Sequence, residues 1–350
     1  MMSIKVNVSE RTLHFKQPAG TSRGVYTTRK IWLIRLTDGI SAGLGECAPL
    51  PKLSCDDIPD YREKLVAKCE EFAAAVNQGA AAVETFFETM RDYPSMLFGM
   101  ETALLNLRNG ECLFDTPFSR GETGIPINGL VWMGTFDEMQ QRMEQKLAQG
   151  FHCIKLKIGA IDFDAEMELL RQLRCRFGHR EVELRVDANG AFRFEEDALY
   201  KLELLSQYAL HSIEQPIPAG QWSYMAELCR ESPLPVALDE ELIGINDPGQ
   251  KRQMLNIIRP RYLVLKPSLH GGMMGCREWI AIARDMGIRT WITSALESNI
   301  GLNAIAQFCS SVYGNVITMP QGLGTGRLFT DNIDMPLEIR GERLWISKPF

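Results

Sequence analysis

The sequence lacks the features that mark several large protein classes. It contains no run of 18 uncharged apolar residues, and its first fifteen residues have no apolar stretch of the kind found in signal peptides. Lys and Arg form no block long enough for a basic arm, and the formal net charge is -6. We therefore expect a cytoplasmic protein that is neither a membrane protein nor a general nucleic-acid binder.

Cysteine and histidine occur, but without the spacings that disulfides or zinc need. The nine cysteines are odd in number and scattered, and no CxxC pair occurs among them. The five histidines show no HExxH or other paired spacing. We expect reduced thiols that are mostly buried and structural, and no zinc site.

The N-terminal third has its own pattern. Residues 3–17 and 27–51 alternate polar and apolar side chains with Asp-Gly and Gly-rich breaks, which predicts an antiparallel meander. Apolar residues at spacings of three and four predict helices over 59–78, 83–92 and 96–109. The 350 residues are too many for one small core, so we expect residues 1–118 to form a self-contained α+β unit, the domain that is called the capping domain below.

From residue 125 onward, short apolar runs alternate with helical stretches, which is typical of βαβ units. Polar residues near the ends of six of these runs lie 25 to 30 residues apart, a length that fits one strand, one helix and two loops. The eight runs are IPINGLV, HCIKLKI, VELRVDA, LHSIEQP, PVALDE, RYLVLKP, RTWITSA and NVITMP. They predict an α/β fold, a (β/α)8-type barrel over residues 119–325. A doubly wound sheet remains the alternative, although it does not usually place polar residues at so many consecutive strand ends.

Three of these runs end in a carboxylate, namely Asp187, Glu214 and Asp239. Barrel strands carry catalytic groups at their carboxyl ends, so the three side chains are expected at one mouth. Carboxylates in such proximity repel one another unless a cation lies between them, and their hard oxygens suit Mg²⁺ or Mn²⁺. Any one of them alone is as well explained as a cap of the following helix.

Lysines flank the carboxylates in strand order. Lys155 and Lys157 lie one strand before Asp187, and Lys266 lies one strand after Asp239. A lysine acts as a base at neutral pH only when burial or a nearby cation lowers its pKa, and Lys155 and the metal together can supply that charge to Lys157. A solvated surface lysine is the alternative, but an unpaired ammonium inside an apolar run is costly. A metal between two lysines suits removal of a proton next to a carboxylate, with stabilisation of the resulting enediolate.

The ordered motifs resemble those of the enolase superfamily, in its muconate-lactonizing subgroup. They are GLGECAPLP at 43–51, KLK at 155–157, DAN at 187–189, EQP at 214–216, ALDE at 237–240 and LKP at 265–267. Within that subgroup, IPINGLVWMG at 125–134, LRVDANGAF at 184–192 and TSALESNIG at 293–301 are similar to o-succinylbenzoate synthases.

The resemblance implies dehydration of 2-succinyl-6-hydroxy-2,4-cyclohexadiene-1-carboxylate to o-succinylbenzoate, a step of menaquinone biosynthesis on a small-molecule carboxylate. By this resemblance Lys157 abstracts the proton and helps to expel the hydroxyl as water, while Lys266 stabilises the enediolate. Asp187, Glu214 and Asp239 then bind Mg²⁺.

A second group of residues is expected around the substrate. The resemblance gives Arg185 an orienting role and places a closing loop near residues 21–26, which is equally well read as a hairpin tip. Asn189 shares a strand face with Arg185 and Asp187. Further candidates for the pocket are Asn128, Ser294, Trp132 and Met133, the last two equally explained by packing.

Other functions of the same framework remain open. N-acylamino acid racemization and muconate-type cycloisomerization share the metal and the lysines, whereas a dipeptide epimerase is disfavoured because residues 316–326 contain no DxD. A metal-binding barrel without catalysis is less consistent with the complete set of lysines. Residues 326–350 predict a hairpin that returns to the capping domain. The sequence does not indicate an oligomeric state.

Overall fold

The structure is a computed structural model that describes residues 3–21, 24–159 and 161–347. Its N-terminal part is a three-stranded antiparallel sheet in the order β1-β2-β3, formed by β1 (Lys5–Thr21), β2 (Gly24–Thr37) and β3 (Ala42–Cys47). Two helices, α1 (Tyr61–Gln78) and α3 (Pro94–Asn109), pack against this sheet, and α2 (Ala80–Thr89) packs against α1. The predicted meander and the three predicted helices are confirmed.

The close packing of α3 on β3 explains part of the GLGEC motif. A Cβ atom at Gly45 would collide with the backbone carbonyl of Gly99 in α3, so only glycine allows the two backbones to approach this closely. The buried side chains of this layer include Trp32, Ile34 and Phe72. The capping domain therefore has its own apolar core.

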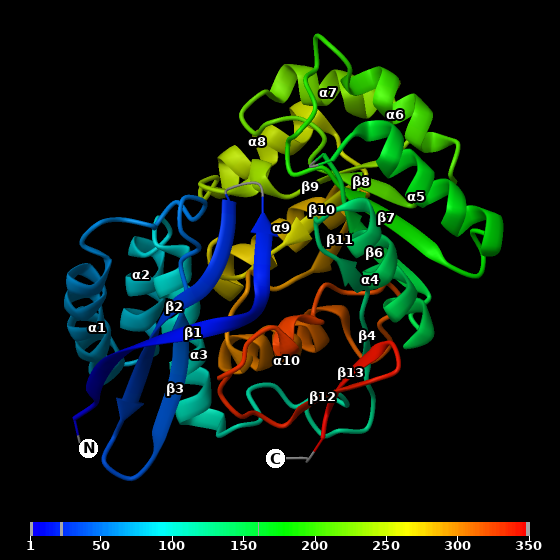
Figure 1. Cartoon of the computed structure of the whole chain (residues 1–350). Coiled ribbons are helices and arrows are strands. Elements are labelled where there is room, and N and C mark those ends of the chain that lie inside the picture. Colours follow the sequence, from blue (N-terminus) through cyan, green and yellow to red (C-terminus); the bar gives the residue numbers. More distant parts are fainter. Residues whose placement is uncertain (1–2, 22–23, 160, 348–350) are drawn as a thin grey trace.

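The rest of the chain forms a curled, all-parallel sheet with helices on its outer face (Figure 1). Its strands are β5 (Gly129–Val131), β6 (Cys153–Lys157), β7 (Glu183–Asp187), β8 (Ser212–Glu214), β9 (Val236–Leu238), β10 (Tyr262–Leu265) and β11 (Arg289–Ile292). The helices are α4 (Phe136–Ala148), α5 (Phe163–Arg176), α6 (Ala198–Ser206), α7 (Trp222–Glu231), α8 (Pro248–Ile258), α9 (Gly272–Asp285) and α10 (Asn299–Tyr313). Neighbouring strands follow one another in chain order, without the reversal that defines a doubly wound sheet. The barrel-type fold is confirmed.

The eighth strand does not lie where the sequence predicts it. The run NVITMP forms no strand, and Val316 within it is 79% exposed. Instead Gln321 bridges to Ile127, and Gly322 bridges to Thr293 on the opposite edge of the sheet. Pro320 has no N–H group to donate to a neighbouring strand, so the hydrogen bonds start one residue later, where Gln321 N donates to Pro126 O at 2.8 Å. The barrel is thus closed by two residues.

The C-terminal hairpin is confirmed, but it does not pair with the cap sheet. Strands β12 (Leu337–Arg340) and β13 (Arg343–Ile346) join β4 (Ile125–Pro126) in a small antiparallel sheet. Contact with the cap comes from the segment before the hairpin, where Phe329 bridges to Phe15 of β1. This segment follows the short 3₁₀ helix η2 (Thr325–Arg327). The domain boundaries remain a prediction.

Two further expectations concern cysteines and membranes. All nine cysteines are free, and five of them are buried, as expected for reduced structural thiols. Among the helices described here, none combines the length and the apolar character required to cross a bilayer.

Candidate active site

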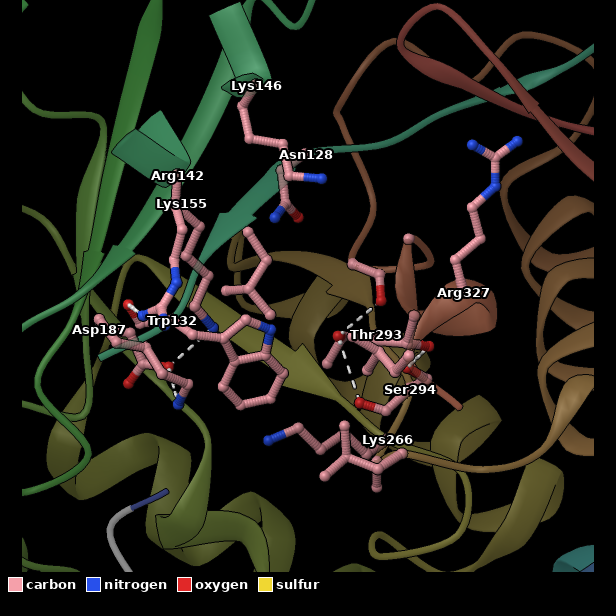
Figure 2. Close-up of a pocket in the computed structure, with 18 of the residues that line it drawn as sticks. Asn128, Trp132, Arg142, Lys146, Lys155, Asp187, Lys266, Thr293, Ser294 and Arg327 are labelled. Atoms are coloured by element: carbon pink, nitrogen blue, oxygen red, sulfur yellow. Dashed lines mark hydrogen bonds and ion pairs between the residues drawn. The ribbon is translucent and has the colours of Figure 1, made fainter. Parts of the chain in front are cut away.

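The carboxyl ends of the barrel strands open into a cavity of about 350 Å³. Both domains contribute to its wall, because Gln17 and Leu50 come from the cap and Lys157, Asp187 and Lys266 from the barrel. Figure 2 shows Lys155, Asp187, Lys266 and Ser294 converging on this cavity. Of the expected polar strand ends, Lys155, Lys157, Asp187, Lys266 and Ser294 line the cavity, whereas Glu214 and Asp239 lie behind Lys155 and Lys266 as their hydrogen-bond partners.

The lysines of β6 contact carboxylates of the next two strands, β7 and β8. The ammonium of Lys155 lies 2.9 Å from Asp187 Oδ2 and donates to Glu214 Oε2 at 2.6 Å. Lys157 Nζ lies 3.2 Å from the same oxygen of Asp187 and donates to Asn189 Oδ1 at 2.6 Å. Lys155 and Lys157 therefore share one face of β6, as a strand requires of residues two apart.

These buried charges shift one another's pKa values in opposite directions. Burial alone would raise the pKa of Asp187, but Lys155 and Lys157 lower it well below the usual range. Burial and the charge of Asp187 raise the pKa of Glu214 well above its usual range. Burial lowers the pKa of Lys155, but Asp187 and Glu214 outweigh burial and raise it. The carboxylates present here need more positive charge than the lysines supply if all are to be ionised.

The third carboxylate lies on the other side of the cluster. Asp239 follows β9, and its Oδ2 accepts a hydrogen bond from the ammonium of Lys266, which follows β10. The backbone N–H of Lys266 donates to His270 Nδ1 at 3.0 Å. Burial lowers the pKa of His270 to about 3, so this ring is neutral and holds the start of the loop after β10.

Asn189 connects the carboxylates to a fourth acid. Its backbone lies in the left-handed region, with φ at 45°, which asparagine tolerates better than most residues. This conformation lets Asn189 N donate to Asp187 Oδ1 at 3.0 Å, while its side-chain amide donates to Glu240 Oε1 at 2.9 Å. Burial and the charge of Asp239 raise the pKa of Glu240 to about 7.

The donor atoms of this cluster fit a hard divalent cation. Among the described residues, no three His, Cys, Asp or Glu side chains already converge in the arrangement of a metal site. However, Glu214 Oε1 and Asp239 Oδ1 are buried and have no hydrogen-bond partner in the described part of the chain. Buried carboxylate oxygens without donors are costly, and they are the ligands that Mg²⁺ prefers.

The expected substrate residues separate into two groups. Asn128, Trp132 and Ser294 line the cavity (Figure 2), and so does Asn189. Trp132 also packs its ring against the Lys157 ammonium, with 5.9 Å between Nζ and the ring centroid, and Ser294 Oγ lies 2.6 Å from Thr325 Oγ1.

Arg185 and Met133 do not line this cavity. The Arg185 guanidinium is buried, donates to Glu183 Oε1 and to Pro320 O, and stacks over Trp291 with 4.7 Å to the ring centroid. It thus links β7 to the residue before the short eighth strand, which fits an orienting role. The expected closing loop at residues 21–26 includes residues 22 and 23, which lie outside the described residues.

A buried polar network holds the cap loop beside the cavity. Arg29 donates to carbonyl oxygens of both domains, namely Ala48 and Pro49 in the cap and Ala295 and Leu296 in the barrel. The cap loop that follows carries Leu50 and Leu53, which line the cavity. Arg29 therefore fixes the position of one wall.

The same junction contains two buried glutamates. Glu46 of β3 accepts from the backbone N–H groups of Ser298 and Gly301 at 2.8 and 2.9 Å, at the start of α10. Glu297 accepts from Ala295 N at 2.6 Å and from the Ser268 hydroxyl. Anionic groups are favourable at a helix N-terminus, so Glu46 ties the cap to the barrel.

Several residues of the site are absent from the sequence-based expectations. Glu240 belongs to the quoted motif ALDE, so a second acid beside Asp239 was a usable signal. His270 lies four residues after Lys266, but nothing in a single sequence indicates that its ring accepts from the Lys266 backbone. Lys146 and Arg327 also line the cavity, although neither lies at a strand end.

The comparisons with known proteins agree with this geometry. The model of the family described as Enolase C-terminal domain-like matches residues 138–348, and that of MenC, N-terminal domain, matches residues 20–107. The chain is 44% identical to the o-succinylbenzoate synthase of Desulfotalea psychrophila, over 99% of this chain and 100% of that protein. The chain belongs to the o-succinylbenzoate synthase family of the enolase superfamily.

A solved structure from the same family and a more distant relative extend the comparison. The crystal structure of MenC from Desulfotalea psychrophila matches this family member with a TM-score of 0.83 and 41% identity, over 98% of this chain and 100% of that chain. The L-Ala-D/L-Glu epimerase of Bacillus subtilis is 24% identical over 89% of this chain and 86% of that protein. The expected superfamily and fold are confirmed.

Proposed function

We propose that this protein is a Mg²⁺-dependent o-succinylbenzoate synthase, a lyase of menaquinone biosynthesis. It dehydrates 2-succinyl-6-hydroxy-2,4-cyclohexadiene-1-carboxylate, a small-molecule carboxylate. The observation that carries the proposal is that Lys157 and Lys266 line one cavity from either side of Asp187 and Asp239 in strand order, in a chain of this family. A cytoplasmic location remains a prediction of the sequence.

The reaction begins at the carbon next to the substrate carboxylate. Lys157, in its neutral form, takes the proton from this carbon onto Nζ, and the electron pair of the C–H bond enters the enediolate. Asn189 orients this lysine, because its Oδ1 lies 2.6 Å from Nζ. The ammonium of Lys266 compensates the negative charge that develops on the carboxylate.

The second half of the reaction breaks the C–O bond. The electron pair of the enediolate forms the new ring double bond as the hydroxyl leaves, and Lys157 returns its proton to that oxygen. The products are water and the aromatic ring, and the lysine is neutral again. Trp132 and the cap residues Leu50 and Leu53 keep bulk water away from this step.

The proposed metal ligands are Asp187, Glu214 and Asp239. A bound Mg²⁺ supplies positive charge for the substrate carboxylate as the enediolate forms. Asn189 N and Lys155 hold Asp187 in place through bonds of 3.0 and 2.9 Å. Lys155 also donates to Glu214, so it positions two of the three carboxylates.

Racemization of N-acylamino acids is the second candidate, because removal and return of a proton by two lysines needs the same side chains. Lys157 and Lys266 both line the cavity, which favours this side activity over reactions that need one base alone. Dipeptide epimerization needs the same two lysines, but residues 316–326 contain no DxD motif. Cycloisomerization receives no specific support from these residues.

The first experiment is a steady-state assay of the purified protein with the cyclohexadiene substrate and Mg²⁺, following the absorbance change on aromatisation. Fast turnover that stops after chelation and returns with added Mg²⁺ supports the proposal. Absence of turnover by folded, Mg²⁺-supplied protein would refute it, and N-acylamino acids are then the next substrates to test.

A further inference from the structure

The charges that line the cavity are unevenly distributed. Its two acidic lining residues, Asp187 and Glu240, both lie at the strand ends beside the lysines. The other charged lining residues include Arg142, Lys146 and Arg327, and among the described residues no further acid lines the cavity. Figure 2 shows Lys146 and Arg327 in its upper half, whereas Asp187 lies at the left and Lys266 below.

The two basic residues Lys146 and Arg327 line the same cavity from different elements. Lys146 lies in the last turn of α4, which starts at a capping box formed by Thr135 and Glu138. Arg327 lies in η2, which follows the two-residue eighth strand. Leu130 of β5 lines the same cavity as these two residues.

Arg142 is already engaged within the protein. Its Nη1 donates to Trp132 O and Met133 O at 3.1 and 2.8 Å, and Glu138 lies 3.9 Å from its Nη2. These bonds hold the loop between β5 and α4. Arg142 is therefore held by its own loop and neutralised by an acid of the same helix.

Lys146 and Arg327 have no such partners. Within the described part of the chain, neither forms an ion pair with an acidic side chain. The Lys146 side chain crosses Gly129, where a Cβ atom would lie 3.2 Å from its Cγ and Cδ, and its Nζ lies 5.1 Å from the Phe151 ring centroid. Burial and the charge of Arg327 lower the pKa of Lys146. Two neighbouring cations thus face one cavity and repel each other. An anion bound between them would remove this repulsion.

We propose that Lys146 and Arg327 form a second carboxylate subsite, which binds the succinyl carboxylate of the substrate. This inference rests on the proposed function. That substrate carries two carboxylates, one next to the carbon that loses the proton and one at the end of the succinyl chain. The first belongs beside Lys157 and Lys266, and the second reaches the only part of the described cavity wall that offers unpaired cations.

The test measures binding of two ligands by titration calorimetry in the presence of Mg²⁺. One ligand is o-succinylbenzoate, and the other is its ester methylated at the succinyl carboxylate. Lys146→Met and Arg327→Gln are each expected to weaken binding of o-succinylbenzoate by about tenfold or more, as for the loss of a charge-assisted hydrogen bond. Binding of the ester is expected to be weaker than that of o-succinylbenzoate in wild type and to change little in either variant.

The matched control is Arg340→Gln, because Arg340 is exposed, pairs with Glu338 and does not line the cavity. In the turnover assay, the two subsite variants should raise KM with little change in kcat, and Arg327→Lys should restore part of the affinity. Unchanged affinity for o-succinylbenzoate, or equal losses for both ligands, would overturn the subsite.

The outcome for the subsite is separable from that for the proposed function. If wild type does not turn over the cyclohexadiene substrate, the synthase proposal fails on its own. Ligand-selective loss of o-succinylbenzoate binding in the variants would still support a dicarboxylate subsite, whereas turnover with unchanged KM in both variants would overturn it.

Discussion

Two groups of buried charges lie within this molecule, and they are satisfied in different ways. At the junction of cap and barrel, Arg29 donates to four carbonyl oxygens, and Glu46 accepts from two backbone N–H groups and a hydroxyl. In the strand-end cluster, by contrast, Glu214 Oε1 and Asp239 Oδ1 have no partner. The charged groups named at the junction all have hydrogen-bond partners, while the cluster is arranged for charges that the described residues do not provide.

The largest effect is expected from a substitution inside the cluster. Lys157→Ala should lower kcat by a factor of about 10⁴ or more, because it removes the proposed base. Mg²⁺ affinity should remain close to wild type, since Lys155 still pairs with Asp187. Steady-state kinetics and Mg²⁺ titration measure the two quantities, and turnover near the wild-type rate would remove Lys157 from the mechanism.

A second substitution tests the unpaired oxygens directly. Asp239→Asn should weaken Mg²⁺ binding by about a hundredfold or more, because a neutral amide is a poorer ligand than a carboxylate. Calorimetric titration with Mg²⁺ measures this change. The control is Asp38→Asn in the exposed turn between β2 and β3, which should bind Mg²⁺ like wild type. Equal affinity of Asp239→Asn and wild type would exclude Asp239 as a ligand.

At the junction, the expected loss is one of stability. Arg29→Met should lower the free energy of unfolding by about 2–5 kcal/mol, because it leaves buried carbonyl oxygens without donors. Arg35→Met on the same strand is the control, since Arg35 is exposed and should change stability by less than about 0.5 kcal/mol. Urea unfolding followed by circular dichroism compares the two, and similar stability of both variants would contradict the role given to Arg29.

The last expected effect concerns pH at the junction. Glu101 of α3 accepts from Met273 N and Met274 N at 2.6 and 2.8 Å, and burial raises its pKa to about 8. The folded protein therefore keeps the Glu101 proton at pH values at which the unfolded chain has already released it. Stability should fall by about 3 kcal/mol as pH rises from 5 to 8, and Glu101→Gln should remove this part of the dependence. If the difference in unfolding free energy between Glu101→Gln and wild type did not change with pH, the role given to Glu101 would be wrong.

The residues at the strand ends were predictable because polar residues recur there at a regular spacing along the sequence. A carboxylate or lysine closes successive βα units, and parallel strands bring their carboxyl ends to one edge whatever the loops do. The meander and the helices of the cap were predictable for the same reason, since both depend on spacings within one element.

Features that depend on contacts between distant segments were not predictable. A single sequence does not show that Pro320 delays the eighth strand by one residue, or that Arg185 points to Pro320 rather than into the cavity. Lys146 and Arg327 come from a helix and a loop without a common period, so only the fold brings them to the same wall.

The two-residue closure of the barrel has a consequence for the order of folding. Strands β5 to β11 pair with neighbours in chain order, so each new pairing closes a loop of one helix and its connections. The bridge between Ile127 and Gln321 instead joins the first strand to the last and closes the longest loop of the domain. We expect this seam to form last and to open first, so amide protons there should exchange before those of β7 and β8.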